Sequence, residues 1–177
     1  QGYYPDLEYE IISTEMDTLW KYLEDDKIDI CITNIDSSFH DNTYDLEILE
    51  TSDAKIVVSL THPWVLKETV SEEDMVKADI LLLRSENNVN KSLPYDRISC
   101  RNSRTVSDFD SMLTVLESGN HFAVFPMTFE YIKLARFKYF DLPDNIKFSF
   151  NTVCAAKRKS KSTAVEKVMN LIHNEYG

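Results

Sequence analysis

One segment constrains the fold of this chain more than any other: an amphipathic helix that leads through a short acidic turn into an apolar strand. Leu19, Trp20 and Leu23 recur at helical spacing, which predicts a helix with one buried face. The strand that follows, Ile28–Ile32 (IDICI), is nearly all apolar. A strand that is apolar on both faces is typical of a parallel sheet covered by helices on both sides. This passage therefore predicts an α/β fold.

Two later segments repeat the pattern. Ile80–Leu83 (ILLL) and His121–Phe125 (HFAVF) are apolar runs of strand length. Each follows a helical segment that opens with a capping pattern, Ser-x-x-Asp, at 71–74 and at 107–110. A similar pattern at 14–17 opens the first helix. The other expected strands are 7–12, 46–49, 55–60, 98–102, 138–142 and 147–156, with a hairpin turn at 51–53, and the other expected helices are 127–136 and 162–175.

The composition excludes several classes of protein. With 30 acidic and 19 basic residues the net charge is −11, so the surface as a whole repels a polyanion, and we expect any DNA contact to be made by something outside this chain. Only three glycines occur, and neither a dinucleotide-binding GxGxxG turn nor a phosphate-binding loop can be written from the sequence. No apolar run approaches the roughly 20 residues of a transmembrane helix. We expect a cytoplasmic protein without membrane contact.

The reactive residue types form no recognisable catalytic or metal site. The four histidines are widely separated, and the three cysteines have no short spacing. This argues against a metal centre and against a disulfide framework. No serine lies in a GxSxG motif. We therefore expect no cofactor, no metal and no enzymatic activity.

Five segments follow one another in the chain: Tyr4–Ile11 (YPDLEYEI), Leu23–Ile32, Leu60–Pro63 (LTHP), Glu117–Pro126 (ESGNHFAVFP) and the Leu142-Pro143 step. In this order they resemble the effector-binding regulatory domain of LysR-type transcriptional regulators, over residues 3–177. The chain departs from that pattern at His121, which replaces a motif glycine, and at 84–95, where a helix common in relatives is reduced or missing. The winged helix-turn-helix and the first regulatory strand and helix of relatives are not in this sequence, so we expect a fragment of a longer polypeptide.

The resemblance implies a type 2 periplasmic-binding-protein-like fold. Such a fold has two Rossmann-like α/β lobes, joined by two crossover strands, with a ligand cleft between them. By that likeness, lobe I comprises residues 1–59 plus 154–177, and lobe II comprises residues 60–153. Relatives also form dimers or tetramers, which would place the expected 7–12 strand in an interface that faces the helix at 108–118.

Ligands of open α/β sheets bind beyond the carboxyl ends of the strands, and polar residues stand there in this sequence. Small hydroxyls, helix amides and a fixed arginine suit a carboxylate or another small polar anion. Each residue also has a plainer reading: a helix cap at 13–14, turn residues at 33–34, a surface ion pair for Arg84 and packing for Phe125. The candidate effector-binding residues are Ser13, Thr14, Thr33, Asn34, Thr61, Arg84, Ser85, Phe125 and Pro126.

These observations predict an effector-sensing regulatory domain of a bacterial LysR-type regulator. It would bind a small molecule in the cleft between the lobes and so modulate DNA binding and transcription by the full-length protein. The alternative is a solute-binding protein of a transport system, which shares the fold. An enzyme on the same scaffold is disfavoured because no catalytic constellation is present.

Overall fold

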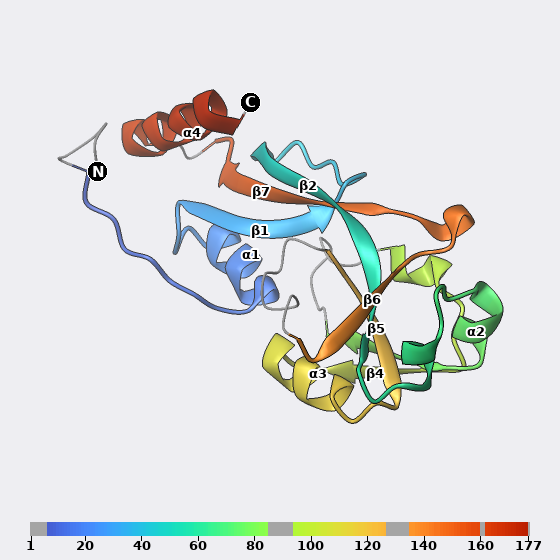
Figure 1. The fold of residues 1–177 in the computed structure, drawn as a ribbon. Helices are drawn as coiled ribbons and strands as arrows, with labels where there is room; N and C mark the ends of the chain where they lie inside the picture. Colours follow the sequence, from blue (N-terminus) through green and yellow to red (C-terminus); the bar gives the residue numbers. More distant parts are fainter. Residues whose placement is uncertain (1–6, 85–93, 127–134, 160–161, 177) are drawn as a thin grey trace. The chain divides into compact units, whose positions relative to one another are not determined.

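The computed structural model describes residues 7–84, 94–126, 135–159 and 162–176. The chain divides into two compact units, the first made from 1–33, 40–49 and 153–177 and the second from 34–39 and 50–152. Three strands contribute residues to both units: β1 (Ile30–Asp36), β2 (Tyr44–Ser59) and β7 (Ser149–Lys157) (Figure 1). Three of the four boundaries between the units therefore fall within strands, and the fourth, between residues 39 and 40, follows β1.

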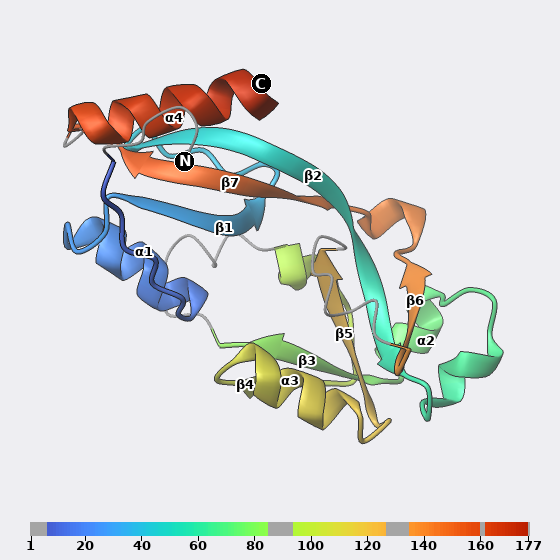
Figure 2. The same ribbon diagram turned by 60° about the vertical axis from the view of Figure 1, so that its left-hand side comes forward.

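In the first unit, helices α1 (Met16–Glu24) and α4 (Thr163–Tyr176) lie on opposite sides of the strands (Figure 2). Trp20 of α1 is fully buried, and its ring packs edge-on against Tyr44 at 5.1 Å. On the other side, Met169 of α4 contacts Cys154 of β7, with 3.6 Å between the two sulfur atoms. The apolar stripes of both helices thus find their partners on the strands, as their spacing predicts.

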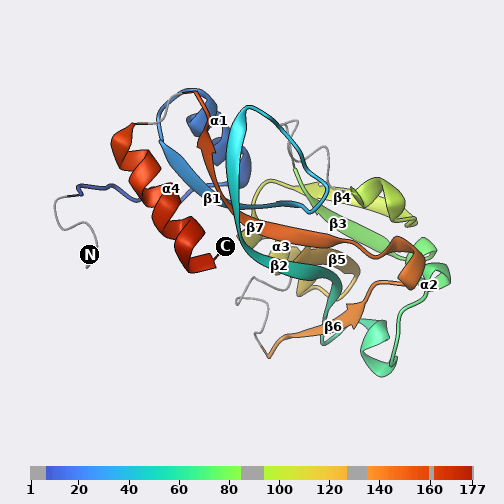
Figure 3. The same cartoon turned by 90° about the horizontal axis from the view of Figure 1, so that it is seen from above.

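The second unit is built on a mixed sheet. Strand β5 (His121–Pro126) is antiparallel to β2 and parallel to β3 (Asp79–Leu83), which is in turn parallel to β4 (Asn102–Val106). Strand β6 (Phe137–Asp141) lies antiparallel along β2 (Figure 3). Across the chain the strands pair in the order β1-β7-β2-β5-β3-β4, with β6 also on β2. The architecture is mixed α/β, as predicted.

Side chains alternate between two cores in the second unit. Ile56 and Phe122 belong to one core, while their neighbours Val57 and Ala123 belong to the other. Helix α2 (Glu72–Val76) supplies a residue to the core of Ile56 and Phe122, and helix α3 (Phe109–Leu116) supplies residues to the core of Val57 and Ala123. Helix α3 lies against β3 and β4 (Figure 2). Burial on both faces explains why β3 and β5 are almost continuously apolar.

Many predicted elements are confirmed. The strands at 80–83 and 121–125 correspond to β3 and β5, the last helix to α4, and the segments 138–142 and 147–156 to β6 and β7. The Ser71–Asp74 capping box forms in full at the start of α2. The predicted helix at 127–136 falls mostly outside the described residues.

Strand β2 corrects the predicted hairpin. Residues 51–53 do not turn: β2 continues through them as one strand of 16 residues. The reason is that the turn-forming side chains are hydrogen-bonded to β7 instead. Thr51 Oγ1 donates to Asn151 Oδ1 at 2.8 Å, and Ser149 Oγ donates to Asp53 Oδ1 at 3.0 Å. Pairing with a distant strand overrides the local turn signal.

Strand β1 is also displaced from its prediction. It covers Ile30–Asp36 rather than 28–32, so Thr33 and Asn34 lie inside the strand and not beyond its end. Thr152 Oγ1 of β7 donates to Asn34 Oδ1 at 2.8 Å, which satisfies a residue that would otherwise favour a turn. Ile32 is 59% exposed, so the strand is not covered on both faces at this residue.

Two further predictions are wrong. Residues 7–12 form no strand, and Tyr9 and Ile11 are exposed, because no described strand pairs with this segment. The strand expected at 98–102 instead begins at Asn102, as β4. None of the helices in the described ranges is long and apolar enough to cross a membrane.

Candidate functional site

The carboxyl ends of β3, β4 and β5 form one edge of the second unit. These strands are parallel, and Ile80 stands opposite Phe122, so β3 and β5 end side by side. Arg84 follows β3, and its backbone N–H donates to the carbonyl of Val106 at the end of β4, at 2.8 Å. Pro126 ends β5. The structure therefore brings the predicted residues Arg84, Phe125 and Pro126 to one edge, which we call the strand-end edge. Ser85 lies outside the described residues.

An acidic residue that the sequence did not single out also lies at this edge. Asp108 caps α3: its Oδ1 accepts from the Ser111 backbone N–H at 2.7 Å, and its Oδ2 accepts from the hydroxyls of Ser107 and Ser111, both at 2.6 Å. These hydrogen bonds to the Ser107 and Ser111 side chains and backbone lower the pKa of Asp108 to about 2. The predicted cap, Ser107 with Asp110, is wrong by one residue.

This cap changes what the strand-end edge can bind. A helix N-terminus attracts anions through its free amides and its dipole, and here the Asp108 carboxylate already occupies that position. The expected contribution of free helix amides is therefore not available at α3. Of the predicted residues in this unit, Arg84 supplies the positive charge. It is exposed, so its guanidinium can meet a carboxylate from solvent.

Phe125 faces the core and not the strand-end edge. Its side chain is 3% exposed and packs edge-on against Phe109 of α3, with 5.2 Å between the ring centres. Pro126 is also buried, opposite Ala54 of β2. The packing interpretation of Phe125 thus describes the structure, and Pro126 is buried as well.

Thr61 lies at the opposite end of β5 from Pro126, which corrects the expectation that it joins the other candidates. Gly119, just before β5, has φ +77°, and a side chain there would overlap the Thr61 hydroxyl. The hydroxyl is also 2.9 Å from the Ser59 hydroxyl. Thr61 follows the carboxyl end of β2, but β2 runs antiparallel to β5, so that end meets the amino end of β5.

The remaining candidates stand in or near the first unit. Ser13 and Thr14 are exposed and precede α1. The predicted cap by Thr14 does not form, because Glu15 is the N-cap and it makes no side-chain capping bond. Thr33 is 7% exposed within β1, and its neighbour Asn34 is bonded to β7 and belongs to the second unit.

No metal centre is formed by the residues that the structure describes: they contain no group of three or more His, Cys, Asp or Glu side chains able to hold an ion. Burial raises the pKa of Cys31 to about 12 and that of Cys154 to about 11. With these raised pKa values both thiols stay protonated at neutral pH. They are therefore unreactive, because the thiolate is the reactive form. Both cysteines are therefore packing residues.

Comparison with known proteins identifies the family. The sequence matches the family model described as "LysR substrate binding domain" over residues 2–177. The chain belongs to the LysR substrate-binding domain family. No curated protein has a significant sequence match to it.

Solved LysR domains share the fold. The C-terminal domain of a probable LysR family regulator from Rhodococcus sp. RHA1 superposes with a TM-score of 0.74 at 16% identity, covering 97% of this chain and 86% of that one. The BenM effector-binding domain with benzoate gives 0.67 at 16%, covering 98% and 80%. The QuiR effector-binding domain with shikimate gives 0.70 at 12%, covering 92% and 78%. This LysR domain therefore has the type 2 periplasmic-binding-protein-like fold.

The family assigns this LysR domain to ligand-sensing regulatory domains and not to enzymes. The alternative of a transport solute-binding protein is not favoured. Full-length regulators are also similar in structure, and the chain spans 57–59% of their length.

Proposed function

We propose that this domain senses a small carboxylate or another small polar anion, and that Arg84 binds its negative group. The observation that carries the proposal is the position of Arg84 at the end of β3, beside the ends of two parallel strands. Carboxylate effectors support it: the related BenM domain was solved with benzoate and the QuiR domain with shikimate. Both compounds carry one carboxylate on a six-membered ring.

The other parts of the proposal follow the sequence predictions. Ser13, Thr14, Thr33 and Asn34 would contact the effector from lobe I (residues 1–59 plus 154–177), and Arg84 and Pro126 from lobe II (60–153). We leave out Thr61, which lies at the far end of β5, and Phe125, whose side chain is in the core. The effector would act through different affinities for two arrangements of the lobes.

We also propose that the complete protein is a cytoplasmic, oligomeric transcription regulator. The related CbnR was solved at full length with its target DNA. The net charge of −11 on this chain supports DNA contact through a separate domain, because phosphate neutralisation requires basic residues. Oligomerisation would then carry the effector signal to that domain.

The test is a thermal-shift and calorimetric screen of benzoate, shikimate and aliphatic carboxylates on the 177-residue chain. We expect at least one carboxylate to bind, and Arg84→Ala to weaken it by about ten- to hundredfold, the value of a charge-assisted hydrogen bond. Asn34→Ala should weaken it less. The matched control is Arg136→Ala, which removes the same charge from a residue paired with Glu117 at 2.6 Å, near the amino end of β5. Unchanged binding in both Arg84→Ala and Asn34→Ala would refute the site.

A further inference from the structure

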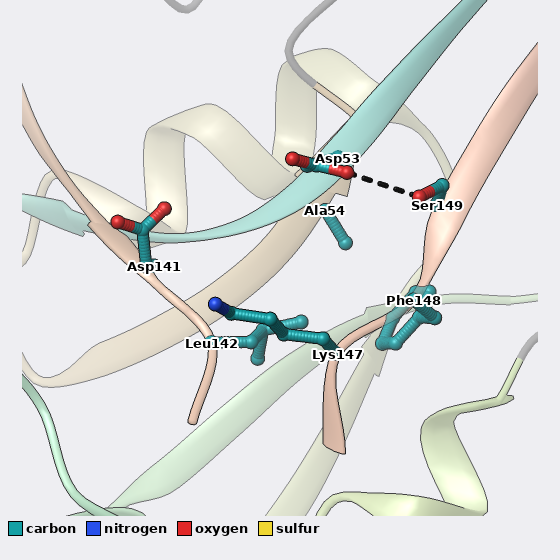
Figure 4. Close-up of a pocket in the computed structure, with 7 residues that line it drawn as sticks. All are labelled: Asp53, Ala54, Asp141, Leu142, Lys147, Phe148 and Ser149. Carbon is teal, nitrogen blue, oxygen red and sulfur yellow. Dashed lines mark hydrogen bonds between the residues drawn. The ribbon is translucent and has the colours of Figure 1, made fainter. Parts of the chain in front are cut away.

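A concave site lies within the second unit, away from the strand-end edge. It is a pocket of about 200 Å³ in which Lys147 reaches across toward the Asp141 side (Figure 4). None of the residues predicted to bind the effector lines it. The lining residues are Asp53, Ala54, Asp141, Leu142, Lys147, Phe148 and Ser149.

The floor of this pocket is apolar and well fixed. Ala54, Leu142 and Phe148 are 3%, 2% and 9% exposed and belong to one core. The Ala54 backbone N–H donates to the Phe148 carbonyl at 3.0 Å, which ties β2 to the segment before β7. The pocket is therefore held by sheet pairing and core packing rather than by a loop alone.

The rim carries charges of both signs. Asp53 accepts a hydrogen bond from the Ser149 hydroxyl at 3.0 Å, and Asp141 pairs with Lys55. Lys147 pairs with Asp144, with 2.6 Å between Nζ and Oδ1. The lysine partner lowers the pKa of Asp141, and Asp144, Asp141 and Asp53 together raise the pKa of Lys147, so both groups are charged at neutral pH.

From this arrangement we propose that the pocket binds a small zwitterion, an α-amino acid with an apolar side chain. Its ammonium group would pair with Asp53 and Asp141, its carboxylate with Lys147, and its side chain would cover Leu142 and Phe148. The volume equals about seven water molecules at about 30 Å³ each, which suits a ligand of about ten non-hydrogen atoms or fewer. This proposal does not depend on the carboxylate site at Arg84.

The position of the pocket suits it to regulate the response to an effector. Within β2, residue 50 is the first residue of the second unit, and Asp53 lies three residues after it. Within β7, residue 152 is the last residue of that unit, and Ser149 lies three residues before it. Both residues thus stand on strands shared by the two units. A ligand held there would act on the shared strands and so tune the response to an effector bound elsewhere.

The probes are L-leucine, leucinamide, which carries only the positive charge, and 4-methylpentanoate, which carries only the negative charge. Binding to the 177-residue chain is followed by NMR shifts of the backbone amides at 53–54 and 147–149. We expect leucine to bind, and each single-charge analogue to bind about tenfold or more weakly, because each lacks one charge-assisted hydrogen bond.

Asp53→Asn and Lys147→Gln should each weaken leucine by about tenfold or more. The exposed ion pair of α2 supplies the matched controls, Glu73→Gln and Lys77→Gln, which should leave binding unchanged. Arg84→Ala should also leave it unchanged, which separates this pocket from the proposed effector site. No leucine binding, shifts confined to the strand-end edge, or binding that survives both pocket variants would overturn the proposal.

Discussion

Strand β5 is only six residues long, yet its two ends have different surroundings. At the amino end, Gly119 adopts φ +77° against Thr61, and His62 is buried at 6% exposure beside Trp64, 4.7 Å between the ring centres. At the carboxyl end, Arg84 is exposed and Asp108 holds a charge at the start of α3. One end is closed by packing, and the other presents charged groups to solvent.

This difference teaches where substitutions should act. A change at the amino end should alter the free energy of unfolding and leave the ligand affinity of the folded domain unchanged. A change at the carboxyl end should alter electrostatics with little loss of stability. Parallel sheets commonly divide in this way, because ligands meet the carboxyl ends of the strands.

The largest effect is expected for Gly119→Ala, at the closed end. A non-glycine residue at positive φ costs about 1–3 kcal/mol of unfolding free energy, and the added methyl group would also overlap the Thr61 hydroxyl. Urea denaturation measures the loss. Adding Thr61→Ala to this variant removes the hydroxyl and should restore part of the stability. If Gly119→Ala is as stable as the wild type, the amino end is not closed as described.

A smaller effect is expected from acid at the same end. His62 Nδ1 accepts a hydrogen bond from the Trp64 backbone N–H at 3.1 Å, and burial together with the nearby His121 lowers the pKa of His62. The unfolded chain therefore binds a proton below about pH 6.5 that the folded chain resists, so stability should fall as pH drops from 7 to 5. Thermal midpoints at both pH values test this. His62→Asn should flatten the dependence, whereas His40→Asn, on an exposed residue, is the control.

The smallest effect is expected for Asp108→Asn, at the open end. Asparagine also caps helices but lacks the negative charge, so stability at neutral pH should fall only slightly. The pKa of Asp108 is lowered to about 2, so its contribution is present above the usual value near 3.8 and is lost as pH falls toward 2. The variant should lack that part of the acid dependence between pH 4 and 2, as followed by circular dichroism. An identical acid profile for wild type and variant would contradict the cap.

The sequence predicts those parts of the fold whose signals are local. Strands β3 and β5 are apolar runs of strand length, and the α2 cap lies within four residues. The extent of β1 and β2 is different, because it depends on hydrogen bonds that β2 makes to Asn151 and that β1 accepts from Thr152, about 100 residues further along the chain. A local turn pattern of three residues carries no information about such distant partners.

The same limit applies to the sites. Arg84 is predictable, because it follows an apolar strand and the strand-end rule needs nothing more. Asp53 and Lys147 are not, because only the pairing of β2 with β7 and β6 brings them to one pocket. The sequence predicts the α3 cap one residue too early, at Ser107, since Ser107 and Asp108 are both good caps and only backbone geometry decides between them.

The division of the chain also sets an order of events during synthesis. Apart from residues 34–39, the second unit is one continuous stretch, 50–152, whereas the first needs residues 153–177, which leave the ribosome later. Domains generally fold as units as they emerge. The second unit can therefore form its β2–β5 core before β7 and α4 are complete. Folding of the first unit is then the later step, and the apolar faces of β1 and α1 stay exposed until it occurs.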